Sequence, residues 1–240
     1  MLHDSCFMTG HMSHDTSKLE HKIGVTFKNP ELLLQALTHR SYINENPKWP
    51  LDHNERLEFL GDAVLELVVT EHLYRTYPNP EGELTNWRAA LVNAVMLADI
   101  SKVFDLNEYM LLSRGEAKDT GRARQYILAN AMESLIGAIY LDQGYEKSAE
   151  FIHAFVLSEL PRIIKDNLYR DAKSLFQEKA QEQVGITPNY EVIQEWGPDH
   201  ARQFKVGVYL GKDLVADGEG PSKQEAQQKA AEMALKAKGW

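Results

Sequence analysis

The chain has 240 residues, of which 43% are hydrophobic and 25% charged, and its formal net charge at pH 7 is −9. That length allows one large domain or two ordinary ones, and the composition is typical of a globular protein. The acidic balance argues against a protein that coats nucleic acid through bulk electrostatics, so any nucleic-acid contact must be local. No apolar run is long enough to span a membrane, and the single cysteine, Cys6, cannot form an intramolecular disulfide. We therefore expect a cytoplasmic protein with no membrane partner.

The first two thirds of the chain have a helical pattern. Residues 1–16 show no clear period, and we expect a disordered leader there. From 17 to 165 apolar residues recur every three or four positions, which predicts helices and no convincing strand. The clearest boundary signals are Asn29 as a cap before a helix that begins after Pro30, Pro78 and Pro80 after a helix over about 55 to 76, and Gly144 after QYILANAMESLIGAIYLDQG. GELTNWRAALVNAVMLADISKVF predicts one or two further helices, and SAEFIHAFVLSELPRII predicts a last one.

The pattern changes after a short linker, residues 166–170. A helical segment, AKSLFQEKAQEQVG, is followed by three short β-like runs, NYEVIQEWG, ARQFKVGVYLG and KDLVADGEG, and then by the Ala-rich helix SKQEAQQKAAEMALKAKG. Residues 171–240 therefore predict an α-β-β-β-α module. The fold class expected for the whole chain is an all-helical domain over 17–165 followed by this α+β module.

Three acidic residues share a stripe of the helix predicted over about 55 to 76. Glu58 and Asp62 follow Glu55 by three and seven positions, which places all three on one helix face. A solvated face is the ordinary explanation for such a stripe. Here the other positions are apolar nearly all round, so the helix offers no broad polar side for these acids to join. Crowded carboxylates repel one another unless something positive compensates, and the stripe therefore indicates that a cation lies beside it.

Several blocks of the sequence carry a family resemblance. They are LTHRSYINEN (37–46), NERLEFLGDAVLEL (54–67), PEGELTNWRAALVN (80–93), SRGEAKDTGRARQYILANAMESLIGAIYLD (113–142) and the C-terminal module. Together they resemble bacterial ribonuclease III. The resemblance implies an all-helical endonuclease domain over 17–165, which acts as a homodimer, followed by a double-stranded-RNA-binding domain over 171–240. It also implies Mg²⁺-dependent cleavage of RNA duplexes to 5′-phosphate and 3′-hydroxyl ends, in the processing of ribosomal, messenger and other structured RNA precursors.

The resemblance assigns roles to the acidic residues. It implies that Glu58, Asp62 and Glu133 ligate Mg²⁺ and that Glu55 assists from the same helix as Glu58. Glu81 is similar to a further acidic position that lines the family's catalytic valley. The expected catalytic residues are thus Glu55, Asp62, Glu81 and Glu133. Mg²⁺ is a hard cation that prefers oxygen ligands and keeps several waters, and Mn²⁺ is the expected substitute ion.

One position of this set departs from the family pattern. Where the family most often has Asp three residues before the second-helix Glu, this sequence has Asn130. Asn130 and Glu133 would share a helix face, and an amide oxygen still ligates Mg²⁺, although it brings no negative charge. We expect weaker metal binding with cleavage retained. The alternative function is a double-stranded-RNA-binding protein whose nuclease site is impaired by Asn130. A metal-dependent hydrolase of another substrate would require the C-terminal module to be an unrelated fusion.

Phe59 lies on the acidic helix but at an angle away from the carboxylate stripe. An ordinary core aromatic is one explanation. The resemblance instead implies a dimer-interface residue that enters a pocket of the partner subunit. Nearer the second acidic helix, the segment with Gly115, Glu116 and 122–124 predicts a loop. Its basic residues either help to position a phosphate backbone or are simply solvated.

The resemblance also assigns RNA contacts in the C-terminal module. Minor-groove contacts are implied for Gln177, Glu178, Gln181 and His200, and phosphate contacts for Ser222 and Lys223 at the positive end of the last helix. Gln177 and Gln181 are alternatively plain surface residues of a helix.

The cation content of this module is a second departure. Where the family commonly has lysines the last helix has Gln224 and Gln227, and residues 171–240 hold 9 Lys and Arg against 11 Asp and Glu. Fewer phosphate contacts imply weaker and less salt-dependent RNA binding. A folded module that no longer binds RNA is the alternative.

Overall fold

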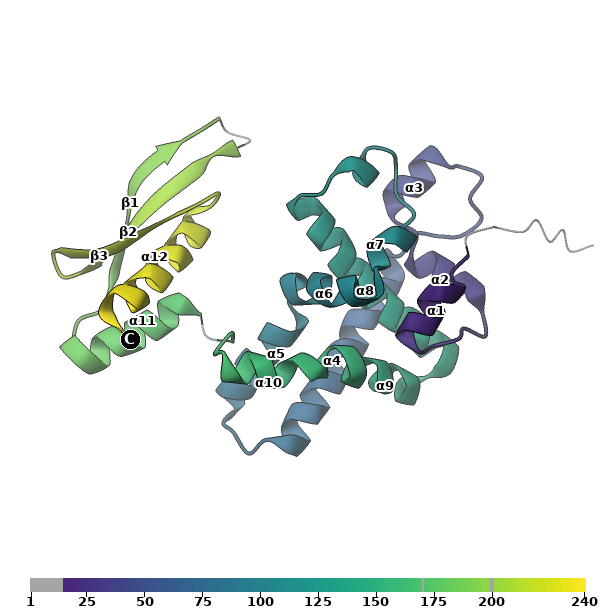
Figure 1. Cartoon of the computed structure of the whole chain (residues 1–240), viewed down its shortest axis with the longest axis horizontal. Coiled ribbons are helices and arrows are strands. Elements are labelled where there is room, and N and C mark those ends of the chain that lie inside the picture. Colours follow the sequence, from purple (N-terminus) through teal and green to yellow (C-terminus); the bar gives the residue numbers. More distant parts are fainter. Residues whose placement is uncertain (1–14, 170, 199–200) are drawn as a thin grey trace, which may run out of the picture. The chain divides into compact units, whose positions relative to one another are not determined.

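The structure is a computed structural model that describes residues 15–169, 171–198 and 201–240. The chain divides into two compact units, the first ending at Leu168 and the second comprising Tyr169–Trp240 (Figure 1). Within the described ranges no helix combines the length and apolarity needed to cross a membrane. The leader expected over residues 1–16 lies outside the described residues, apart from Asp15 and Thr16.

The first unit is helical, and the all-helical domain predicted from the sequence is confirmed. Its helices, shown in Figure 1, are α1 (Ser17–Ile23), α2 (Pro30–Ala36), α3 (Arg40–Glu45), α4 (Glu55–Thr76), α5 (Glu81–Val92), α6 (Ala94–Ser101), α7 (Leu106–Tyr109), α8 (Arg122–Gln143), α9 (Tyr145–Phe155) and α10 (Leu160–Lys165). Short 3-10 turns occupy Lys102–Phe104, Glu116–Lys118 and Leu157–Glu159. An isolated β-bridge joins Thr38 to Leu111.

The helix boundaries follow the capping signals in the sequence. Helix α2 begins at Pro30, and the side chain of its N-cap residue, Asn29, accepts a hydrogen bond from the Glu31 backbone N–H. Helix α8 ends before Gly144, whose φ of 85° suits glycine. The segment predicted as one last helix is instead divided into α9, a 3-10 turn and α10. Pro161 in the first turn of α10 explains the division, because a proline inside a continuous helix removes a hydrogen bond and clashes with the preceding turn.

Helices α4 and α8 form the centre of the first unit. Each has 22 residues, and α8 is buried over most of its middle part, from Ile127 to Ile139. A Cβ on Gly61 would lie 1.7 Å from the backbone oxygen of Glu133, and a Cβ on Gly137 would lie 2.3 Å from that of Leu57. Only glycine fits at either position, because a side chain would overlap the main chain of the other helix. The two helices therefore touch backbone to backbone.

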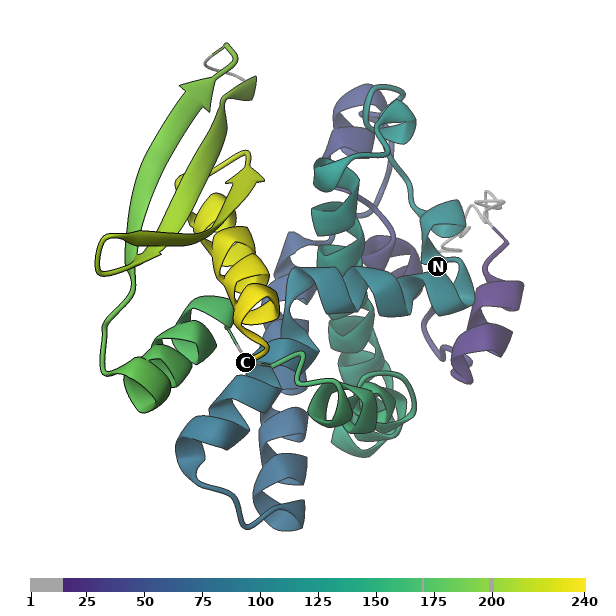
Figure 2. The ribbon, with the colours of Figure 1, turned by 60° about the vertical axis from the view of Figure 1, so that its left-hand side comes forward.

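The second unit is an α-β-β-β-α module, as predicted. Its elements are α11 (Ala172–Val184), β1 (Asn189–Trp196), β2 (Gln203–Leu210), β3 (Asp213–Gly220) and α12 (Lys223–Lys238). The strands form an antiparallel sheet in the order β1-β2-β3, and the helices pack on one of its faces (Figure 2). Phe176, Val208 and Ala230 are fully buried in the core between them. Helix α12 approaches β3 closely because Gly218 has no side chain: a Cβ there would lie 2.3 Å from the Ala230 nitrogen.

A β-bulge in β1 changes which of its side chains face the helices. The register shifts at Ile193, which is the extra residue. Beyond the bulge Glu195 pairs with Phe204, whereas before it Glu191 pairs with Gly207. These two partners are an odd number of positions apart on β2 and so face opposite sides of the sheet. Phe204 is two positions from the buried Val206 and therefore shares its face of the sheet, so Glu195 lies on the helix-covered face and Glu191 on the other.

Candidate active site and RNA-binding surface

The glycine crossing of α4 and α8 sets the position of the acidic residues. Glu58 precedes the crossing glycine of α4 by about one turn, and Glu133 precedes that of α8 by about one turn. The charges of Asp62 and Glu58 act on Glu133, and the Asn130 side-chain amide donates a hydrogen bond to Glu58. The structure thus brings together four predicted residues, here called the acidic centre: Glu58, Asp62, Asn130 and Glu133.

Burial and like charge raise the pKa of two carboxyls in the acidic centre. Burial, with the charges of Asp62 and Glu58 as smaller causes, raises the pKa of Glu133 to about 7. Burial also raises the pKa of Glu58, followed by the charge of Glu55, whereas the hydrogen bond from Asn130 opposes the rise. A cation bound among such carboxyls would favour their ionised forms and lower their pKa values.

The donor set of the acidic centre fits a hard divalent cation. It offers carboxylate oxygens from two helices, and a cation among them would offset the burial and repulsion that raise the pKa of Glu133. Across the described ranges, no three His, Cys, Asp or Glu side chains are grouped closely enough to make a complete metal site by themselves.

Glu55 lies next to the acidic centre and is held by neighbouring basic groups. Its carboxylate is 3.2 Å from Nη1 of Arg40 and 3.8 Å from Nδ1 of His53. The charge of Glu55 nevertheless contributes to the raised pKa of Glu58. Glu55 is therefore an ion-paired neighbour of the acidic centre.

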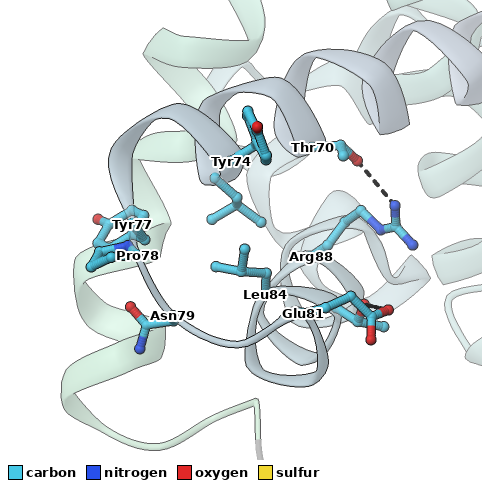
Figure 3. Close-up of a pocket in the computed structure, with 10 residues that line it drawn as sticks. Thr70, Tyr74, Tyr77, Pro78, Asn79, Glu81, Leu84 and Arg88 are labelled. Carbon is cyan, nitrogen blue, oxygen red and sulfur yellow. Dashed lines mark hydrogen bonds between the residues drawn. The ribbon is translucent and has the colours of Figure 1, made fainter.

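Glu81 lies apart from the acidic centre, on a pocket of about 650 Å³ between α4 and α5 (Figure 3). Its carboxylate accepts a hydrogen bond from Oγ1 of Thr85 at 3.2 Å. Arg88 donates to Thr70 Oγ1 at 3.0 Å on the same pocket. Thr70, which lines the same pocket as Glu81, is eight residues after Asp62 on α4, a distance of roughly 12 Å along the helix axis. Within one chain Glu81 therefore lies away from the acidic centre.

Helix α11 presents the residues predicted to contact a minor groove. Gln177, Glu178 and Gln181 are exposed on this helix. The Gln181 amide donates to Oγ1 of Thr187 at 2.6 Å, which ties the end of α11 to the segment before β1. The remaining predicted residue of this group, His200, lies outside the described residues.

The start of α12 presents the residues predicted to contact phosphates. Ser222 is the N-cap and accepts a hydrogen bond from the Glu225 N–H, and Lys223 is the first helical residue. Farther along, the Gln227 amide oxygen accepts a hydrogen bond from Nζ of Lys173 at 2.7 Å. Gln227, which stands where the family commonly has lysine, therefore joins α12 to α11.

Comparisons with known proteins decide the family. A family model described as Ribonuclease-III-like matches residues 29–160, and one described as Double-stranded RNA binding motif matches residues 172–238. The Ribonuclease 3 of Borreliella afzelii is 43% identical over 235 residues, which cover 98% of this chain and 95% of that protein. The chain belongs to the ribonuclease III family.

Two further relatives in the ribonuclease III family agree. The Ribonuclease 3 of Desulforamulus reducens is 44% identical over 220 residues, which cover 91% of this chain and 89% of that protein. The solved nuclease domain of ribonuclease III from Campylobacter jejuni superposes with a TM-score of 0.56 at 38% identity, covering 61% of this chain and 99% of that domain. The fold class predicted for both units is thereby confirmed.

Phe59 is 82% exposed in this member of the ribonuclease III family. The interpretation of Phe59 as an ordinary core aromatic is therefore wrong.

The predicted loop before the second acidic helix is partly ordered by Arg124. Its Nε donates a hydrogen bond to the Asp119 carbonyl at 3.1 Å, and its Nη2 donates one to the Glu116 carbonyl. The prediction that 122–124 belong to this loop is wrong, because these residues form the first turn of α8.

Sequence reasoning missed the residues that fix the two acidic helices. Gly61 and Gly137 are interior helix glycines, which cost stability relative to alanine, and that cost is the signal of a close crossing. Asn54, 2% exposed, was also missed. Its side chain donates to the Ala36 carbonyl at 3.2 Å, and its own carbonyl accepts from Ser134 Oγ at 3.2 Å. Asn54 thus joins the start of α4 to α2 and α8.

Proposed function

We propose that this chain is an Mg²⁺-dependent endoribonuclease that cleaves double-stranded RNA as a homodimer in the cytoplasm. Cleavage of double-stranded RNA follows from its membership of the ribonuclease III family and from the RNA-binding module in the same chain. The observation that carries the proposal is the acidic centre, where carboxyls from α4 and α8 meet beside a backbone contact. The proposed substrates are ribosomal, messenger and other structured RNA precursors, cut to 5′-phosphate and 3′-hydroxyl ends.

Each residue of the acidic centre has a proposed part in this reaction. Glu58, Asp62 and Glu133 hold the ion through carboxylate oxygens. Asn130 orients Glu58 through its amide N–H, and its amide oxygen would be available to a bound ion or to a water on that ion. When bound, Mg²⁺ supplies an acidified water as the nucleophile and stabilises charge on the phosphodiester, and Mn²⁺ is expected to substitute. Glu55 adds negative charge beside Glu58.

A homodimer is proposed because α4 exposes a large aromatic side chain next to its acidic residues. Phe59, 82% exposed, is a natural anchor for a second copy of the chain. The Campylobacter jejuni nuclease domain is described as structurally flexible in a region involved in dimer formation. Two acidic centres related by a twofold axis would address both strands of a duplex. Within one chain Glu81 lies away from the acidic centre. A catalytic role for Glu81 would therefore require the dimer to bring it near the acidic centre of the partner subunit.

The second unit is proposed to hold the duplex by its shape. Exposed polar side chains of α11, together with His200, would face a minor groove and its 2′-hydroxyl groups. Ser222 and Lys223 would face phosphates at the positive end of α12. Contacts to the minor groove and to phosphates, without contacts that read individual bases, suit recognition of a duplex of any sequence.

The test is incubation of the purified chain with a long RNA duplex in Mg²⁺, in Mn²⁺ and in EDTA. We expect short duplex products with either metal, and none in EDTA or with Glu133→Gln. A DNA duplex of the same sequence is the matched control and should stay uncut. Duplex binding without cleavage in either metal would overturn the proposal and favour a protein that only binds RNA.

A further inference from the structure

One acidic residue of the second unit holds two cations on the surface proposed to bind RNA. Glu195, near the end of β1, lies 3.2 Å from Nζ of Lys223 through one carboxylate oxygen and 3.9 Å from Nη1 of Arg202 through the other. Lys223 also lies over the Phe204 ring, with its Nζ 5.5 Å from the ring centroid. The Lys223 amine is therefore held between a carboxylate and an aromatic face.

The position of Lys223 makes this contact relevant to RNA. Lys223 follows the N-cap Ser222 and opens a helix of 16 residues. The free backbone N–H groups and the dipole at such a terminus attract anions. A phosphate that approaches the start of α12 therefore meets an amine that already has a carboxylate partner.

The β-bulge in β1 is what aims Glu195 at Lys223. Bulges redirect the side chains that follow them, and the bulge at Ile193 places Glu195 opposite Phe204 on the helix-covered face. On the other face the strand partner of Gln194, Lys205, is engaged by Asp217 at 3.0 Å. The ion pair at the start of α12 thus depends on one inserted residue in β1.

We propose that Glu195 is an internal competitor of the RNA backbone, which occupies Lys223 in the free protein and yields it to a phosphate when a duplex binds. This inference rests on the proposed phosphate-binding role of Lys223. Glu195 then limits the affinity of the module for duplexes in general. For an endonuclease the consequence is faster release of the cut duplex.

The size of the effect follows from the exposure of the pair. The side chains of Lys223 and Glu195 are 57% and 39% exposed, so their ion pair is weak and opens readily. Removing the Glu195 charge should therefore tighten duplex binding by roughly two- to fivefold. Because Lys223 would then contact phosphate without an internal partner, the slope of log Kd against log salt should steepen by up to about 0.9.

The experiment compares the full chain with Glu195→Gln, using an RNA duplex longer than the roughly 16 base pairs that such a module spans. Binding is measured in EDTA, to prevent cleavage, at several salt concentrations. Glu191→Gln is the matched control, because it removes the same charge from the same strand on the opposite face, where the Glu191 carboxylate accepts a hydrogen bond from Asn189. Lys223→Met supplies a second background, in which Glu195→Gln should tighten binding less than in the unmodified chain, because only the 3.9 Å contact with Arg202 is then left to remove.

The expected result is tighter binding and a steeper salt slope for Glu195→Gln alone. Equal tightening by Glu191→Gln would overturn the proposal, since net charge would then suffice. Weaker binding by Glu195→Gln would overturn it as well, because Glu195 would then be positioning Lys223 for RNA. If the unmodified chain binds and cuts duplexes but Glu195→Gln behaves identically, only the competitor role fails. If no variant binds, the proposed RNA-binding function fails with it.

Discussion

Asn130 is the residue that sets the charge of the acidic centre. Asn130→Asp would replace an uncharged amide beside Glu58 with a carboxylate. We expect the Mg²⁺ concentration for half-maximal cleavage to fall by on the order of tenfold, because affinity for hard cations rises with the number of charged ligands. The measurement is the cleavage rate across an Mg²⁺ titration, with Asn107→Asp, exposed on α7, as the control for added charge. An unchanged midpoint would show that position 130 does not reach the ion.

Glu133 makes the metal-free protein sensitive to pH. Its pKa is raised from an ordinary 4.5 to about 7, so the folded state keeps a proton that the unfolded state releases. The free energy of unfolding without metal should therefore fall as pH rises from about 4.5 to about 7. We expect Glu133→Gln to remove this pH-dependent fall in the free energy of unfolding and to abolish cleavage.

Thermal melts in EDTA check this expectation. At pH 8 Glu133→Gln should melt a few degrees above the unmodified chain, with a gain of roughly 1–2 kcal/mol once solvent screening of a partly exposed carboxyl is allowed for. At pH 4 the two should melt alike. A lower melting temperature for Glu133→Gln at pH 8 would mean that the carboxylate is satisfied without a cation.

At this scale the sequence predicts the acidic stripe but not its surroundings. The spacing of Glu55, Glu58 and Asp62 is visible in the sequence, because all three lie on one helix. Their encounter with Glu133 depends on a crossing of helices far apart in the chain, and only the family resemblance pointed to it. The exposure of Phe59 was likewise beyond a periodicity argument, since helix angle alone does not say which neighbour covers a side chain.

Among the elements, the contact of α4 with α8 carries both the fold and the acidic centre. Gly137→Ala would place a methyl group 2.3 Å from the Leu57 backbone oxygen and force the helices apart. We expect a loss of about 3 kcal/mol or more in the free energy of unfolding, together with weaker stabilisation by Mg²⁺. Chemical denaturation with and without Mg²⁺ measures both.

Gly82→Ala is the matched control for this substitution. Gly82 lies in α5 with nothing within 4 Å of a Cβ, so alanine there should be neutral or stabilising by up to about 1 kcal/mol. If Gly137→Ala were tolerated equally well, the close approach of the two helices would not hold the acidic centre in place.

Helix and strand limits are the best-predicted features of the elements, because their signals are local. Asn29, Gly144 and the prolines after α4 act through their own backbone neighbours. The bulge at Ile193 has no such signal. A Cβ on Gly207 would lie 2.9 Å from Ile193 Cδ1, so the register reflects side-chain packing across strands that the pattern of β1 alone does not contain.

For the whole molecule, Phe59 provides the test of assembly. Phe59→Glu would place a charge where a partner subunit is proposed to bury an aromatic ring, and we expect a dimer to become a monomer. Sedimentation velocity gives the oligomeric state, and circular dichroism shows that the fold is kept. Val103→Glu, at an apolar side chain 70% exposed on another element, is the control and should remain dimeric. A dimer that survives Phe59→Glu would place the interface elsewhere.

The division into two units was readable from the change in sequence pattern, because helical periodicity gives way to short alternating runs. The low cation content of the second unit was equally readable, with 9 Lys and Arg against 11 Asp and Glu over residues 171–240. The sequence did not reveal which of those cations are ion-paired with acidic residues. Pairs such as Lys223 with Glu195 join a helix to a strand and depend on the fold.

The backbone contact at Gly61 and Gly137 also bears on how such a protein can diverge. At this point α4 and α8 contact each other through main-chain atoms alone. Exchange of the neighbouring acidic side chains therefore leaves the contact intact. A descendant that lost every carboxylate of the acidic centre would keep the scaffold and become a catalytically silent copy. The reverse path is closed, because one methyl group at either glycine disturbs fold and chemistry together. Selection for activity therefore acts on the acidic side chains, which can be exchanged. Selection for folding acts on Gly61 and Gly137, where no side chain can be added.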